Sequence, residues 1–319
     1  MTNSRTILCL FKDQADEMDS LTLLAGIPGI IRLAVCGNLA VLEDIKKIGV
    51  EPSLVIISRR LYPEEKPEVV ETLKRLFPVV RFLLISSSAD PFPPLQQLIA
   101  DQIRHLAINP FPGNDKSGAQ RKDFVTTLEK LASGRFLEIS DYLDRHATIH
   151  EYTISGSSQK EELITSIMEI IPGDSTELDA LRQRGALLTD EMLENAMYGA
   201  PRGEDGRKLY RKGENRTIPR REGIVFRFGF DGWTLALEVA DSWGSLSPDL
   251  VMEHLARNQE ETGLCDDTGG RGLFIIWRFL DRFHVNITPG RETVVGGQLA
   301  LSSPLDPEAP KGFYISTHY

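Results

Sequence analysis

The chain has 319 residues, 41% hydrophobic and 26% charged, a composition that suits two globular domains and excludes a disordered or fibrous protein. Its formal net charge of −10 argues against a non-specific nucleic-acid-binding protein, because neutralising phosphates takes a surplus of Lys and Arg. Three scattered cysteines offer no disulfide framework, and no apolar run approaches the roughly 20 residues that span a bilayer, which favours a cytoplasmic protein.

Residues 1–133 alternate between strand-like and helix-like segments. Five short apolar runs are typical of buried strands, and three segments have helical periodicity. This alternation predicts an α/β domain with a doubly wound, five-stranded parallel sheet covered by helices on both faces. The runs are residues 6–11, 30–35, 53–57, 79–85 and 103–108, and the helical segments are 39–48, 69–77 and 124–131.

Five strand–helix units in this length resemble the receiver domain of two-component response regulators. Receivers hold magnesium with an acidic pair after the first strand, phosphorylate an Asp after the third and neutralise the phosphoryl group with a Lys after the fifth. The matching positions are Phe11 and Lys12, then Ser58, then Asn109. The resemblance therefore implies a CheY-like pseudo-receiver, which keeps the fold for dimerisation or partner docking. A flavodoxin-like domain with another role is the alternative.

Residues 134–147 are predicted to form a linker helix between two domains. Phe136, Ile139, Tyr142 and Leu143 recur there at helical spacing, after a break at Gly134. The second domain is expected to begin near residue 148.

Residues 148–303 are predicted to form an α+β two-layer sandwich with a mixed, mostly antiparallel sheet, because two helical segments precede two strand pairs. A strand-like segment comes first, two helical segments follow, and two strand pairs then flank turn sequences. A further helix within a mobile lid is expected at 248–258, and residues 304–319 are interpreted as a C-terminal tail. The strand-like segments are 148–154, 224–230, 233–240, 283–288 and 294–301, and the first two helices are 160–171 and 177–198.

The second of these helices carries two polar residues that can face one cleft. Glu191 and Asn195 lie one helical turn apart. Asn195 Oδ1 can ligate a magnesium ion that bridges phosphates, and Glu191 can orient or deprotonate an attacking group. A solvated helix face would show the same pair.

Two later segments can complete a nucleotide site. Asp241 ends a buried-looking strand, where its carboxylate can accept the exocyclic amine of adenine. At residues 268–276, glycines precede an apolar helix, so backbone N–H groups and the helix N-terminus can meet phosphates. A capped turn would account for the glycines equally well. The candidate contacts there are Gly270, Arg271, Gly272 and Leu273.

The order and spacing of these elements are similar to those of the ATPase superfamily of gyrase, heat-shock chaperones, histidine kinases and mismatch-repair proteins. The ExxxN motif corresponds to residues 191–195, the strand-terminal Asp to Asp241 and the GxGL turn to 270–273. Residues 269–276 are especially similar to the GGxGLxLI of bacterial anti-sigma-factor serine kinases. The resemblance implies ATP and Mg²⁺ as cofactors, with adenine on Asp241, the metal on Asn195 and phosphates along the glycine turn.

The sequence departs from this superfamily at two motifs. The family's DxGxG has Trp243 and Ser245 at its two glycine positions, with Gly244 between them as a candidate nucleotide contact. The closing GTxV motif loses its glycine and keeps Thr293, which is also a candidate contact. The sequence therefore does not determine the backbone geometry on the adenine side of the site.

Residues 201–222 form the one basic patch of the sequence, with eight Arg and Lys residues against four acidic ones. A solvated loop and a contact with a partner or the nucleotide are the two interpretations. Histidine kinases carry a basic residue three positions after the ExxxN Asn, and Tyr198 stands there. Arg271 is therefore the expected source of positive charge for the phosphates.

The chain is interpreted as a bacterial signalling regulator that binds Mg·ATP. In the catalytic interpretation, Glu191 activates a serine hydroxyl on a partner, which makes the protein a protein-serine kinase. The alternative is a non-catalytic protein-binding switch. The expected partner is a regulatory protein of the anti-anti-sigma or sigma-factor type, or a second copy in a homodimer; nucleic acid and membrane are not expected. An orthodox histidine kinase is disfavoured, because His150 lies in a strand-like segment.

Overall fold

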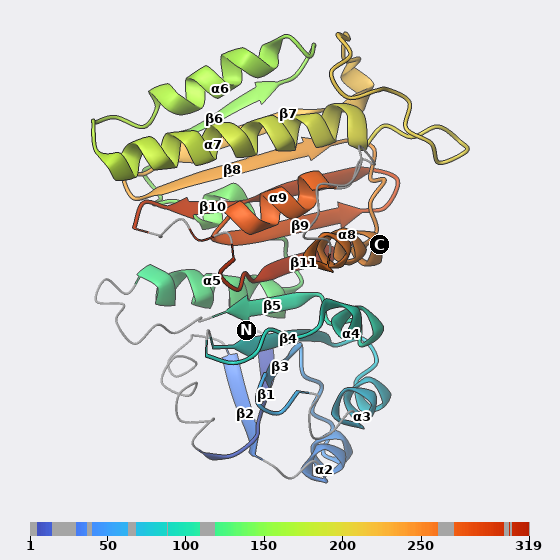
Figure 1. Ribbon diagram of the computed structural model, residues 1–319. Helices are drawn as coiled ribbons and strands as arrows, with labels where there is room; N and C mark the ends of the chain where they lie inside the picture. Colours follow the sequence, from blue (N-terminus) through green and yellow to red (C-terminus); the bar gives the residue numbers. More distant parts are fainter. Residues whose placement is uncertain are drawn as a thin grey trace. The chain divides into compact units, whose positions relative to one another are not determined.

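A computed structural model describes residues 5–14, 30–36, 40–62, 68–87, 89–108, 119–260, 271–302, 306 and 308–318. The chain divides into two compact units, Met1–Leu137 and Glu138–Tyr319, and each contains a sheet with helices packed against it (Figure 1). Asn109 and Gly270, both singled out in the sequence, lie outside the described residues. Within the described ranges, no helix combines the length and apolar character needed to cross a bilayer.

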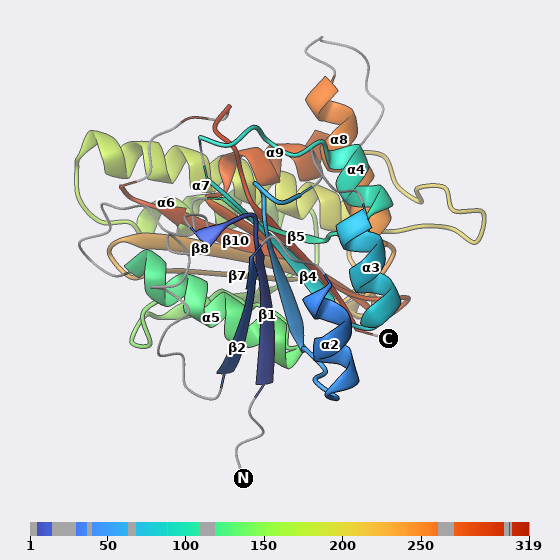
Figure 2. The same ribbon diagram turned by 90° about the horizontal axis from the view of Figure 1, so that it is seen from below.

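The first unit contains a five-stranded parallel sheet in the order β2-β1-β3-β4-β5. Helices α2, α3 and α4 lie on one side of this sheet and α5 lies on the other (Figure 2). Strands β1 and β3 are almost wholly buried, as expected for parallel strands covered on both faces. The strands are β1 (Arg5–Phe11), β2 (Ile30–Cys36), β3 (Leu54–Ser58), β4 (Arg81–Ser86) and β5 (His105–Ile108); the helices are α2 (Val41–Lys47), α3 (Glu68–Leu76), α4 (Leu95–Ala100) and α5 (Ala119–Ser133).

The carboxyl end of β3 holds a buried serine and a buried arginine. Ser58, at the position of the receiver phosphoacceptor, is buried, and its hydroxyl accepts a hydrogen bond from the Arg60 N–H at 3.2 Å. Arg59 donates to the carbonyl oxygens of Tyr62 at 2.6 Å and Pro91 at 3.0 Å. Backbone carbonyls thus hold the buried Arg59 guanidinium directly after Ser58.

Residues 134–147 do not form the predicted linker helix. Gly134 has a φ of 67° just after α5, and only the 3-10 turn Ile139–Asp141 follows. The Glu138 side chain and the Asp141 side chain cap each other's backbone N–H groups around this turn. The apolar residues whose spacing suggested a helix, Ile139, Tyr142 and Leu143, pack on Ala236 of the second unit instead. The division between units therefore falls before the turn, at Leu137.

The second unit contains a six-stranded mixed sheet in the order β11-β9-β10-β8-β7-β6. All neighbouring strands are antiparallel except β11, which runs parallel to β9. The predicted C-terminal tail is therefore wrong for Phe313–Thr317, because this run of aromatic and β-branched residues forms the buried strand β11. The strands are β6 (Ile149–Thr153), β7 (Val225–Phe230), β8 (Thr234–Asp241), β9 (Arg282–Thr288), β10 (Glu292–Ala300) and β11 (Phe313–Thr317).

Helices α6, α7 and α9 cover one face of this sheet (Figure 1). Gly185 of α7 allows the closest approach, since a Cβ there would lie 2.7 Å from Leu235 of β8 and 2.9 Å from Ile167 of α6. Helix α7 begins where the Ser175 hydroxyl accepts the Leu178 N–H, and it runs into a π turn at Asn195–Gly199. The helices are α6 (Gln159–Glu169), α7 (Thr176–Glu194), α8 (Pro248–Glu260) and α9 (Arg271–Phe279).

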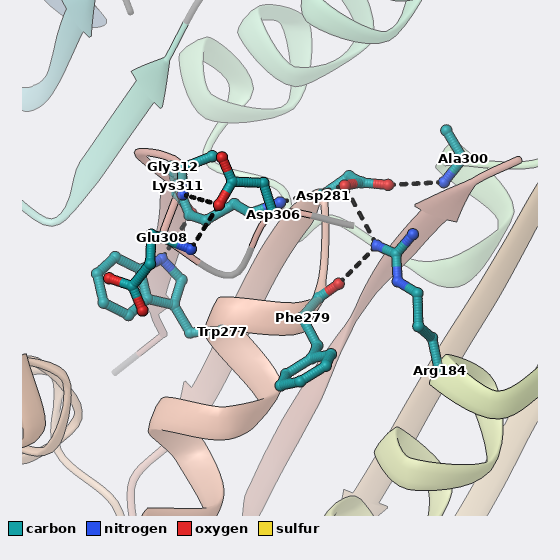
Figure 3. A network of polar contacts seen from close by, with 10 residues as sticks. Arg184, Trp277, Phe279, Asp281, Ala300, Asp306, Glu308, Lys311 and Gly312 are labelled. Carbon is teal, nitrogen blue, oxygen red and sulfur yellow. Dashed lines mark hydrogen bonds and ion pairs between the residues drawn. The ribbon is translucent and has the colours of Figure 1, made fainter. Parts of the chain in front are cut away.

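A polar network fastens the last residues of the chain to this helical layer (Figure 3). Asp281 accepts the Ala300 N–H at 2.8 Å and pairs with Lys311 at 3.3 Å and with Arg184 of α7 at 3.5 Å. The Trp277 indole N–H of α9 donates to the Gly312 carbonyl at 3.0 Å. These contacts hold the segment before β11 in the register that lets the strand join β9.

Candidate functional site

A cavity of about 1100 Å³ lies in the second unit, between the C-terminal end of α7, strands β8 and β10, and the N-terminus of α9. Four segments that are distant in sequence meet around it. Seven of the nine site residues predicted from the sequence line its wall: Glu191, Asn195, Asp241, Arg271, Gly272, Leu273 and Thr293. Of the other two, Gly270 lies outside the described residues, and Gly244 lies elsewhere in the unit.

The π turn at the end of α7 brings Asn195 against the first turn of α9. A Cβ on Gly272 would lie 2.6 Å from both the Nδ2 and Oδ1 atoms of Asn195, so the two residues are in direct contact. Among the described residues, no hydrogen-bond partner serves the buried Asn195 Nδ2. A buried amide without a partner is costly unless a ligand or water completes its hydrogen bonds.

We expect Gly272→Ala to weaken binding of Mg·ATP, the ligand anticipated from the sequence, by ~10-fold, because a methyl group must displace the Asn195 amide. Gly199→Ala is the matched control, since its Cβ would meet Asn195 Oδ1 at an ordinary 3.7 Å. Isothermal titration calorimetry measures both affinities, and thermal unfolding verifies that both variants are folded. Equal affinities in the two variants would show that the contact has no role in binding.

Strands β8 and β10 place a carboxylate beside a hydroxyl on the cavity wall. Asp241 and Thr293 lie directly opposite each other in the antiparallel pair and are 6% and 2% exposed. Asp241 Oδ1 accepts the Trp243 N–H at 2.9 Å, whereas no described group hydrogen-bonds to the Thr293 hydroxyl. Burial raises the pKa of Asp241 to about 7, against the lowering effect of backbone N–H groups from Trp243 and Gly244.

Glu191 lies half-buried at the other side of the cavity, on the last turn of α7. Burial raises the pKa of its carboxyl, and the neighbouring carboxylates of Asp190 and Glu194 raise it further, while Lys212 and Lys160 oppose them. A carboxylate with a raised pKa is a better proton acceptor near neutral pH than an ordinary surface Glu.

Gly244 does not line the cavity, and its assignment as a nucleotide contact stays a prediction. Its φ is 53°, and a Cβ there would lie 2.5 Å from the Thr288 carbonyl oxygen and the Arg291 nitrogen. Its own carbonyl accepts the Gly290 N–H at 3.0 Å. The glycine is therefore needed to pack against the turn between β9 and β10, a contact that no local pattern could reveal.

The cavity wall also includes part of the basic segment, which the sequence left open between solvent and a binding role. The cations that line the cavity from this segment are Arg202, Lys208, Arg211 and Lys212. The local excess of positive charge was the sequence signal for a binding role of this segment. The spacing of its eight cations does not predict which of them face a cavity. His254 of α8 lines the cavity as well and had no signal in the sequence.

No protein-family model matches the chain. No protein of curated function matches it. Among solved structures, the chain is similar to a pilus assembly-related protein from Burkholderia pseudomallei, with 15% identity, 43% of this chain and 96% of that chain covered, and a TM-score of 0.32.

The isolated receiver domain of RcsB from Salmonella enterica serovar Typhimurium is similar at 11% identity, with 44% of this chain and 96% of that chain covered and a TM-score of 0.32. RcsB from the same organism bound to the promoter rprA is similar at 13% identity, with 59% and 92% covered and a TM-score of 0.29. Similarities this weak assign neither a family nor a function to the chain.

Proposed function

We propose that the second unit binds Mg·ATP in the cavity between α7, β8, β10 and α9. The observation that carries this proposal is the convergence of the predicted residues on one cavity from four separate segments. Its wall also contains two buried polar atoms that need a partner, Asn195 Nδ2 and Thr293 Oγ1. A site of this size and mixed polarity suits a nucleotide.

The chemistry of the lining residues fits each part of Mg·ATP. At the end of β8, the Asp241 carboxylate can accept the adenine amine, and Val239 and Val295 offer apolar surface to the ring. At α9, the N-terminus can meet phosphate oxygens through its backbone N–H groups. Asn195 Oδ1 is the protein ligand for the magnesium ion, which in such sites takes most of its other ligands from phosphates and water.

Catalysis would add a proton acceptor to this binding site. Bound Mg·ATP supplies an electrophilic γ-phosphoryl group. A serine hydroxyl of a partner protein would form the new oxygen–phosphorus bond as its proton passes to Glu191, and ADP would leave with the electrons of the broken bond. The raised pKa of Glu191 favours this role.

A binding switch without phosphoryl transfer is the second candidate function. In that case the nucleotide would change the affinity for a regulatory protein, such as a sigma-factor-type or anti-anti-sigma-type partner or a second copy of this chain. The first unit, as a pseudo-receiver, would serve docking or dimerisation. Buried Ser58 at the phosphoacceptor position supports a role other than phosphate acceptance for that unit.

Titration of the full chain with ATP, in the presence and absence of magnesium, tests the proposal. We expect Asn195→Ala to remove the magnesium-dependent part of the affinity, because the ion loses its protein ligand. Gln183→Ala is the control, an exposed residue of the same helix that does not line the cavity. If wild type and Asn195→Ala bind ATP equally weakly, the proposal is lost.

Transfer of radiolabelled γ-phosphate to protein in a cell extract then separates the two candidate functions. A kinase labels a partner, and Glu191→Gln is expected to reduce the labelling while ATP affinity is kept. A switch labels nothing.

A further inference from the structure

Between Arg202 and Lys208, the basic segment forms a small closed loop of backbone at the cavity wall, which we call the ring. Arg202 and Lys208 pair in an isolated antiparallel β-bridge, closed by a hydrogen bond from the Gly203 N–H to the Arg207 carbonyl at 2.9 Å. Residues paired across such a bridge direct their side chains to the same side. The ring therefore sets two positive side chains next to each other at the cavity wall, and both line it.

This pair of cations has no compensating carboxylate in the part of the chain that the structure describes, because neither Arg202 nor Lys208 forms an ion pair there. Partial burial lowers the pKa of Lys208, and repulsion from Arg202 and Lys212 lowers it further. Two like charges facing each other across a bridge are unfavourable until an anion joins them.

Three other cations of the segment, Arg207, Lys212 and Arg216, are already paired with carboxylates. Lys212 lies 3.4 Å from Glu194, a carboxylate that also binds Lys160 at 2.8 Å. Arg207 pairs with Asp205 at 3.6 Å and does not line the cavity. The carboxylates on the wall are Glu191, Glu194, Glu214 and Asp241, and none of them pairs with Arg202 or Lys208.

The ring is also fixed relative to the proposed magnesium ligand. The Ala200 N–H donates to the Asn195 carbonyl at 2.8 Å, and the Leu209 N–H donates to the Pro201 carbonyl at 3.2 Å. Further along, Arg216 holds the segment by donating to the Met197 carbonyl at 2.6 Å. These hydrogen bonds connect the ring that carries the two cations to the π turn that contains Asn195.

We infer that Arg202 and Lys208 form the phosphate-binding pair of this cavity and hold the terminal phosphates of a triphosphate, a role that rests on the proposed nucleotide site. The guanidinium can bind two phosphate oxygens at once, and the ammonium adds a compact positive charge beside it. Tyr198 occupies the position where histidine kinases carry a basic residue, and its hydroxyl donates to the Glu214 carbonyl of the same segment. The segment therefore adds positive charge for the phosphates to that of Arg271, which also lines the cavity, and α7 supplies none at this position.

The test compares Arg202→Gln/Lys208→Gln with a double control, Arg207→Gln/Arg220→Gln, which removes the same charge from the same segment away from the cavity wall. Three probes are titrated into the full chain by calorimetry: Mg·ATP, adenosine and inorganic triphosphate. We expect the Arg202→Gln/Lys208→Gln variant to bind ATP and inorganic triphosphate at least ~10-fold more weakly than the wild type. Its affinity for adenosine should be unchanged. The salt dependence of ATP binding also becomes shallower in this variant.

The outcomes separate this inference from the proposed function. If Arg202→Gln/Lys208→Gln lowers the affinity for ATP no more than the control variant does, the inference is overturned and the proposed ATP site stands. If the wild type binds inorganic triphosphate through the pair but neither ATP nor adenosine, the pair stands and the proposed function is lost. If the wild type binds none of the three probes, both are overturned.

Discussion

Asp241→Asn is expected to weaken ATP binding ~10-fold at pH 8 and at the same time to stabilise the second unit at that pH. The carboxylate at the end of β8 is 6% exposed, and burial raises its pKa to about 7. An ionised Asp241 accepts the adenine amine through a charge-assisted hydrogen bond, which an amide replaces only in part. Binding of ATP by the wild type should therefore strengthen as the pH rises through about 7.

Ionisation of Asp241 strengthens ATP binding, but it lowers the stability of the folded second unit. The pKa of Asp241 is higher in the folded protein than the ordinary value of 3.8, so folding favours the protonated carboxyl. The contribution of this group is complete below 3.8 and is lost as the pH rises through about 7. An Asn side chain does not ionise and can still accept the Trp243 N–H, so the variant should keep above pH 7 the stability that the wild type loses.

Urea unfolding at pH 6 and pH 8, with calorimetric titration of ATP and of inosine triphosphate, checks both effects. Inosine triphosphate lacks the adenine amine, so only the wild type should prefer ATP. Glu292→Gln serves as a control, because Glu292 raises the pKa of Asp241 from a distance. It should shift the midpoint of the pH dependence down and keep the affinity at pH 8. A wild-type pH profile that persists in Asp241→Asn would assign the ionisation to another group.

The helix that leads to Asn195 and the strand that Asp241 ends were both predicted from the sequence. The resemblance of the motif spacing to an ATPase superfamily, and not local periodicity, grouped these two side chains in one nucleotide site, and nucleotide binding there stays a prediction. The antiparallel register that sets Thr293 opposite Asp241 belongs to the pairing of β8 with β10, which neither of the two predicted strand pairs contained.

The features that the sequence did not reveal depend on contacts between distant segments. The residue types of Phe313–Thr317 suit a strand, but its partner β9 is not the preceding strand of the chain, so no hairpin pattern marked β11 as part of the sheet. The positive φ of Gly244 is set by the turn at Gly290. The π turn at Asn195–Gly199 likewise ends a pattern that remains helical in sequence, so the predicted helix extended to residue 198.

On the face of the second sheet opposite the cavity, a buried carboxylate connects residues of three separate segments. Successive residues of β8 alternate between faces, so Glu238 points away from Asp241. Its Oε2 accepts the Ile139 N–H at 3.1 Å and lies 3.5 Å from His284 Nε2, and its Oε1 accepts from Arg227 at 3.1 Å. Burial would raise the pKa of Glu238, but the neighbouring His284 imidazole and the Arg227 guanidinium outweigh it and hold the pKa below its ordinary value.

We expect Glu238→Ala to lower the free energy of unfolding of the second unit by about 3 kcal/mol, because it leaves the Ile139 N–H and part of the Arg227 charge without their buried partner. Glu151→Ala is the matched control: this exposed carboxylate also pairs with Arg227, at 2.6 Å, and its loss should cost well under about 1 kcal/mol.

The lowered pKa of Glu238 contributes stability that is present above the ordinary Glu value of 4.5 and is lost as the pH falls through the folded pKa. The wild type should therefore lose more stability on acidification below 4.5 than Glu238→Ala does, and urea unfolding between pH 3 and pH 7 measures the difference. Equal costs for the two variants would mean that the buried network adds nothing beyond a surface ion pair.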